Sequence, residues 1–132
     1  MKLFFIAMTT IRWEITTMNF NGTAEFQKDF KKLSKKFRSL DDDLVEFKKV
    51  LSETPLGIGK HFNVITKIEF LHIVKARLFC KYLKGSSLRI IYSYFIQEQR
   101  IEFIELYFKG EKEYEDRERI KEYLRIHNPP KK

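Results

Sequence analysis

Between residues 72 and 108 the chain reads HIVKARLFCKYLKGSSLRIIYSYFIQEQRIEFIELYF. Three segments of this stretch are rich in β-branched and aromatic side chains, and polar turns rich in Gly, Ser and Gln separate them. This composition is typical of strands joined by short turns. Strands that follow one another so closely pair as neighbours, so the stretch predicts an antiparallel meander. Its strands are expected at 72–80, 88–95 and 100–108.

The first of these strands has two unlike faces. His72, Val74 and Cys80 fall on one side of the period-2 alternation, and Lys75 and Arg77 fall on the other. We expect His72 and Cys80 to pack in the core, because a lone histidine on an apolar face is more often packed than catalytic. The side with the two basic residues is either a solvated face or a binding surface.

Upstream of residue 72, apolar residues recur at the spacing of one face of a helix. A first helix is expected after Thr23, which can cap it, and a second follows Ser39, where Asp42 completes a weak capping box. A short strand at 18–22 precedes them, a loop is expected at 56–67, and a charged surface helix at 113–125. The apolar residues that we expect to face the core from the two helices are Phe26, Phe30, Leu33, Phe37, Leu44, Phe47 and Leu51.

This order predicts a small single α+β domain, β-α-α-β-β-β-α, in which two N-terminal helices pack on a twisted antiparallel sheet. The domain is expected to span 18–127, with a tail at 128–132. Residues 1–17 form an N-terminal extension with three open interpretations. It is an extra strand, a disordered lead, or sequence upstream of a translation start at Met18.

Charge and composition narrow the class of partner. The chain has 132 residues, and its 26 Lys and Arg against 18 Asp and Glu give a formal net charge of +8. This excess favours a polyanionic partner. One cysteine and three scattered histidines give no metal motif and no disulfide framework, so no metal or other cofactor is expected. No apolar run is long enough for a membrane helix, and no membrane partner is expected.

Taken in order, five segments resemble the RelE/ParE superfamily of bacterial toxins, over roughly residues 18–125. No single segment is specific, but the ordered set fits the family's chain length and charge. The segments are Phe26-x-x-x-Phe30-Lys31-Lys32-Leu33, Lys75-Ala76-Arg77, Leu88-Arg89-Ile90-Ile91-Tyr92, Phe103-Ile104-Glu105-Leu106-Tyr107-Phe108-Lys109-Gly110 and Asp116-Arg117-Glu118-Arg119-Ile120.

The resemblance implies a basic cytoplasmic toxin of a type II toxin–antitoxin module. RelE-like members cut mRNA in the ribosomal A site without a metal, and ParE-like members poison DNA gyrase and cleave nothing themselves. Both bind a small antitoxin, with which a hetero-oligomer is expected. The resemblance thus favours a ribosome-dependent mRNA endonuclease. The alternatives are a gyrase inhibitor and an inactive homologue that only binds its antitoxin.

RNA cleavage without a metal needs fixed cations to stabilise the pentavalent phosphate, and groups that move protons. Arg89 matches the Arg of the family's Arg-x-x-Tyr strand, although it could instead pair with a buried carboxylate such as Glu105. Lys75 and Arg77 match basic family positions, where one serves as general base or phosphate anchor. Lys112 follows the last strand, where family members supply a further basic residue. These four residues are the predicted catalytic set.

Further residues are predicted to contact RNA through charge or base stacking. Gly110 and Asp116 occupy the places where many family members have a catalytic acid or base, and this departure favours the non-cleaving alternatives. Tyr107 and Tyr114 are nearby substitutes. The predicted RNA-binding residues are Lys109, Tyr107, Tyr114, Lys31 and Lys35.

Overall fold

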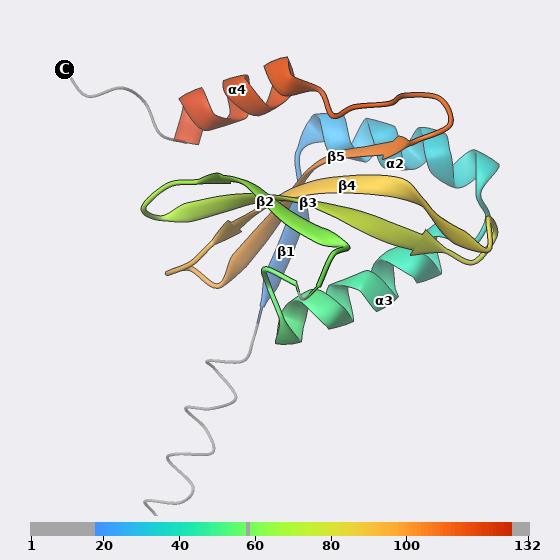
Figure 1. The fold of residues 1–132 in the computed structure, drawn as a ribbon, viewed down its shortest axis with the longest axis horizontal. Helices are drawn as coiled ribbons and strands as arrows, with labels where there is room; N and C mark the ends of the chain where they lie inside the picture. The colour runs from blue at the N-terminus through green and yellow to red at the C-terminus, as the bar shows by residue number, and fades with distance from the viewer. Residues whose placement is uncertain (1–17, 58, 128–132) are drawn as a thin grey trace, which may run out of the picture.

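The computed structural model describes residues 18–57 and 59–127, and the predictions for 1–17 and 128–132 lie outside this part of the chain. A five-stranded sheet runs through the molecule in the order β1-β5-β4-β3-β2 (Figure 1). Its strands are β1 (Asn19–Gly22), β2 (Phe62–Lys67), β3 (Leu71–Cys80), β4 (Gly85–Phe95) and β5 (Arg100–Phe108). The three meander strands pair antiparallel, as predicted, whereas β1 lies parallel to β5 and makes the sheet mixed.

The α+β class is confirmed, and the sheet gains one strand that the sequence prediction missed. Residues 56–67 were expected to form a loop, but 62–67 form β2, which pairs with β3 from Phe62 opposite Ala76 to Lys67 opposite His72. A β-bulge between Val64 and Thr66 interrupts the alternation of side chains along this edge strand. The period-2 pattern that marks a strand in sequence is therefore absent.

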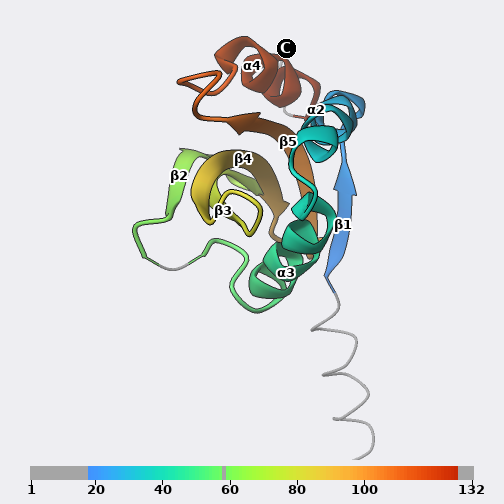
Figure 2. The same cartoon turned by 90° about the vertical axis from the view of Figure 1, so that its right-hand side faces the viewer.

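Two helices cover one face of the sheet (Figure 2). The helix α2 (Ala24–Lys36) begins after Thr23, whose hydroxyl accepts a hydrogen bond of 3.0 Å from the Phe26 amide, as predicted. The helix α3 (Leu40–Glu53) has Ser39 at its N-cap without a capping hydrogen bond from that side chain. The capping box expected there does not form, because the Ser39 hydroxyl donates to Asp43 and accepts from the Tyr82 amide.

The core under these helices is apolar and closed. Alternate residues of β3 and β4 point into it, including Cys80, which is fully buried as predicted, and β5 adds Ile101, Phe103 and Leu106. His72 is also buried, again as predicted. The seven residues expected to face the core all belong to this cluster, with Phe30 only partly buried: Phe26, Phe30, Leu33, Phe37, Leu44, Phe47 and Leu51.

The opposite face is covered at one end only, by α4 (Arg117–His127). Ile120 and Tyr123 of α4 are buried there, and the Tyr123 hydroxyl lies 2.6 Å from both the Ser93 hydroxyl and a Glu102 carboxylate oxygen. The helix begins four residues later than the predicted 113. The Asp116 carboxylate accepts from the Arg119 amide at its start, and residues 109–116 cross the sheet as a loop. No helix in the described ranges is long and apolar enough to span a membrane.

A candidate polyanion-binding site on the open face of the sheet

Three of the predicted site residues lie side by side across three strands. Arg77 of β3 is directly opposite Arg89 of β4, and Arg89 is directly opposite Tyr107 of β5. Their neighbours Leu78, Leu88 and Leu106 point into the core beneath α2 and α3, so these three side chains point to the other face. Directly opposed residues have Cβ atoms only about 5 Å apart. Together Arg77, Arg89 and Tyr107 are here named the arginine row.

The arginine row concentrates positive charge. Arg77 is exposed and Arg89 is half-buried. Burial and the charge of Arg77 lower the pKa of Arg89, although a guanidinium stays protonated. Like charges directly opposite one another destabilise a sheet. An anion placed between the two guanidinium groups would relieve this repulsion, and the planar donors of Arg suit a phosphate.

Lys75 lies two residues before Arg77 on β3 and therefore points to the same face, where the Glu115 carboxylate binds it. Its Nζ is 2.8 Å from Oε1 of Glu115, and both side chains are mostly buried. Burial acts to lower the pKa of Lys75, but the hydrogen bond to Glu115 and the nearby Tyr107 outweigh it, and the pKa rises. Burial acts to raise the pKa of Glu115, but Lys75 outweighs it and the pKa falls. Both groups are therefore charged at neutral pH.

A second acidic side chain fixes the loop at 109–116. Glu105 is only 1% exposed, and its two oxygens bind Lys112 Nζ and, at 2.8 Å, the Asp116 amide. The same Lys112 ammonium lies 5.5 Å from the centre of the Tyr107 ring. The loop thus carries Lys112 and Glu115 to the arginine row and Lys75.

The remaining predicted RNA-binding residues are more scattered. Lys109 is exposed, and its amide donates to the carbonyl of Ser87, which lies two residues before Arg89 on β4. Tyr114 is 60% exposed on the loop. Lys31 and Lys35 are exposed on α2, which packs against the other face of the sheet. The structure therefore brings together Lys75, Arg77, Arg89, Tyr107 and Lys112, whereas Lys31 and Lys35 lie on α2.

Sequence reasoning missed the role of Glu115. Glu115 was placed in the predicted surface helix at 113–125, but it lies before α4 and binds Lys75. Arg119 binds Asp29 of α2 at 2.7 Å. The only sequence signal was the density of charge at 111–118. Within the described ranges, no group of three or more His, Cys, Asp or Glu side chains could hold a metal ion.

Comparison with solved structures finds a match in the crystal structure of the archaeal RelE–RelB complex from Pyrococcus horikoshii OT3. The TM-score is 0.55 at 21% sequence identity, and the match covers 71% of this chain and 97% of that chain. No protein-family model and no curated protein matches the sequence. The chain therefore has the RelE fold, as the resemblance of its sequence segments predicted.

Proposed function

We propose that this protein is a RelE-like toxin that cleaves mRNA on the ribosome. The observation that carries the proposal is the arginine row beside Lys75 on an open sheet face. Two guanidinium groups and an ammonium can hold a scissile phosphate and stabilise the charge that develops on it. The RelE fold and the net charge of +8 support the same proposal.

Electrostatic stabilisation of the phosphate is the main contribution proposed for these residues. The pKa values of Lys75 and Tyr107 are raised, Tyr107 by burial, and the pKa of Glu115 is lowered. All three pKa values move away from neutrality, where a general acid or base works best. Lys75 is thus proposed as a phosphate anchor rather than a base. Tyr107 is only 4% exposed and its hydroxyl is buried, so it packs beside the two arginines rather than contacting the RNA.

This lack of a group tuned to neutral pH favours a second candidate function. A gyrase inhibitor of the ParE type binds without cleaving, and it needs only the shape and the charge of the surface. The arginine row would then contact an acidic partner surface instead of RNA. The two candidates differ in what stops the cell: one blocks translation, the other damages DNA.

Induced expression in a bacterium, followed by primer extension on a well-translated mRNA, tests the proposal. We expect translation-dependent cuts with the wild type and none with Arg89→Ala. Arg38→Ala is the matched control, because it removes the same charge from an exposed position in the turn between α2 and α3. Cuts that persist in a folded Arg89→Ala variant would contradict the proposal. Growth arrest without cuts would favour the gyrase candidate, and supercoiling would be assayed next.

We also propose that a small antitoxin protein neutralises the toxin in the cytoplasm. The support is that the Pyrococcus horikoshii RelE was crystallised in complex with RelB. Co-expression of a small acidic protein encoded beside this gene is expected to restore growth and to co-purify with the chain. An arrest that no neighbouring gene relieves would contradict this part of the proposal.

A further inference from the structure

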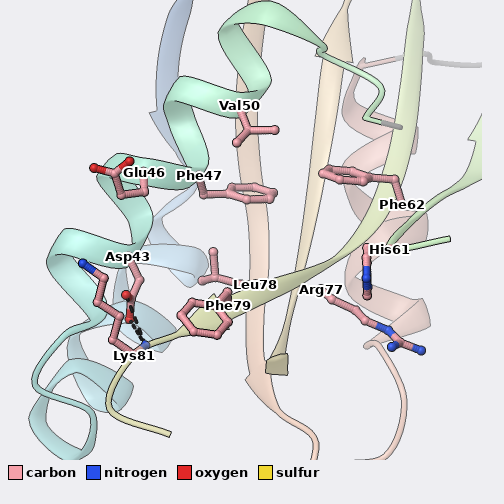
Figure 3. Close-up of a pocket in the computed structure, with 10 residues that line it drawn as sticks. All are labelled: Asp43, Glu46, Phe47, Val50, His61, Phe62, Arg77, Leu78, Phe79 and Lys81. Atoms are coloured by element: carbon pink, nitrogen blue, oxygen red, sulfur yellow. Dashed lines mark hydrogen bonds between the residues drawn. The ribbon is translucent and has the colours of Figure 1, made fainter. Parts of the chain in front are cut away.

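A second candidate site lies next to the arginine row, beside the C-terminal end of β3 and the segment that leads into β2. It is a pocket of about 400 Å³, within the size range of small-molecule sites, between α3 and the segment that enters β2 (Figure 3). Ten residues line it: Asp43, Glu46, Phe47, Val50, His61, Phe62, Arg77, Leu78, Phe79 and Lys81.

Aromatic rings form much of the apolar wall. The rings of Phe47 and Phe62 are nearly parallel, 5° apart with centroids at 6.0 Å, and the Phe79 side chain is 55% exposed. Gly57 fixes the position of Phe62. It has a φ of +74°, and a Cβ placed there would lie only 2.0 Å from Phe62 Cγ. Only glycine allows this close approach, so the wall is held in place from behind.

The charged residues around the pocket are of both signs, and they differ in whether they have a partner. The Asp43 carboxylate is buried and accepts hydrogen bonds from Ser39 and from the Lys81 amide, and Glu46 pairs with Lys49 at 3.3 Å. Across residues 18–57 and 59–127, no carboxylate pairs with the side chains of Arg77 or Lys81. The two acidic groups thus have partners of their own, and the Arg77 and Lys81 side chains remain available to a ligand.

Arg77 belongs to both sites, because it lines the pocket and stands in the arginine row opposite Arg89. We propose that the pocket binds an unstacked nucleobase of single-stranded RNA, whose neighbouring phosphate lies on Arg77 and Arg89. Splayed bases that stack on aromatic side chains are the usual mode of single-stranded RNA recognition. This inference rests on the proposed function, since it assigns the base that accompanies the phosphate on the row.

An apolar segment of a protein partner is the competing occupant. Two observations favour the base. The pocket is continuous with a cationic row through a shared arginine, and three of its five apolar side chains are phenylalanines. A planar ring stacked on the exposed Phe79, with a phosphate beside it on Arg77, satisfies both features, whereas an apolar helix would leave Arg77 and Lys81 without a partner.

Binding of a labelled five-nucleotide single-stranded RNA, followed by fluorescence anisotropy, tests the inference. The matched probe has the same length but an abasic central nucleotide, which keeps the phosphates and removes one base. We expect Phe79→Ala to weaken binding of the intact RNA about 5- to 150-fold, the usual cost of losing one base–aromatic stack. It should leave binding of the abasic RNA unchanged. Phe79→Tyr should retain the affinity, because it keeps the ring.

Tyr82→Ala is the control, because Tyr82 is also 55% exposed but does not line the pocket. It should change neither affinity. Arg77→Ala should weaken both probes and flatten the salt dependence by roughly 0.7 in log–log slope, the value for one phosphate on a single strand. That result would show that Arg77 acts on the backbone and Phe79 on the base.

Three outcomes would overturn the inference. These are equal weakening of both probes by Phe79→Ala, no binding of RNA by the wild type, and a Phe79→Ala variant that binds RNA normally but loses a co-purifying antitoxin. The last would assign the pocket to a protein partner. The proposed cleavage is judged separately by primer extension with Arg89→Ala, so either idea can fail alone.

Discussion

The two faces of the sheet are built from the same strands, yet they differ in nearly every physical respect. The face under α2 and α3 is closed, apolar and rich in rings, with Phe103 packed against Phe20, Phe26 and Tyr92. The other face is covered by α4 at one end (Figure 2). Away from α4 it carries the arginine row and Lys75, beside the loop at 109–116. Both faces bury apolar side chains, but the second face also holds the arginine row and the Lys75–Glu115 pair.

Polar contacts add to apolar packing in connecting α4 to the rest of the molecule, since Ile120 and Tyr123 are also buried in a cluster with strand residues. Asp29 of α2 binds both the Arg119 side chain and the Leu106 amide at the outer edge of β5. Arg119 also donates to the Ile104 carbonyl. The open face is therefore more dependent on charge and pH than the closed face, and the following predictions test that difference.

The largest effect is expected in the closed face. Phe103→Ala removes a ring that is 2% exposed, and it should cost about 3–5 kcal/mol in the free energy of unfolding. Val45→Ala is the control, because Val45 is 51% exposed on α3. Urea denaturation measures both. A loss below about 1 kcal/mol for Phe103→Ala would show that this core collapses around the cavity.

Asp29→Ala should have the next largest effect, about 2–3 kcal/mol, because it leaves the mostly buried Arg119 guanidinium and the Leu106 amide without this partner. Hydrogen exchange should show faster opening of α4 than of β3 and β4. The control is Glu25→Ala, since Glu25 is 64% exposed and lies 3.6 Å from Arg119. Uniformly faster exchange over the whole sheet would contradict a separate role for this contact.

Glu115→Gln should cost about 1 kcal/mol at neutral pH, within the range of partly exposed ion pairs. The pKa of Glu115 is lowered in the folded chain, so its contribution is present above the ordinary value of 4.5 and is lost as the pH falls through the folded pKa. The pKa of Lys75 is raised, so its share is present below 10.5 and is lost at higher pH. Wild type and variant should therefore converge in stability at both extremes, which pH-dependent denaturation would show.

Arg77→Ala should have the smallest effect on stability, a gain of up to about 0.5 kcal/mol, because it removes one of two like charges that lie opposite each other. The gain should shrink at high salt, which screens exposed charges. Arg38→Ala should show no such gain. A clear loss of stability in Arg77→Ala would mean that the arginine row supports the fold rather than a ligand.

Local sequence patterns predicted most of the fold for identifiable reasons. The alternation along β3 placed Val74, Ala76 and Cys80 inside, and the helical spacing from Phe26 to Leu51 found the faces of α2 and α3. The strand β2 was not predicted, because its bulge and its polar residues break the alternation of apolar and polar side chains. The start of α4 was predicted too early, because the charged residues at 113–116 resemble a helix surface. In the structure the Asp116 amide binds Glu105, and the Glu115 carboxylate binds Lys75.

The sequence by itself determined the class of fold, the two-sided strands and the position of Lys75 and Arg77 on one face of their strand, because these follow from local periodicity, whereas the alignment of Arg89 with Arg77 depends on register. Only the tertiary structure decided the pairing of Glu115 with Lys75, of Asp29 with Arg119, and the aromatic pocket beside Arg77. Each of these joins residues from different elements. Their proximity depends on strand register and helix packing, which no short window of sequence contains.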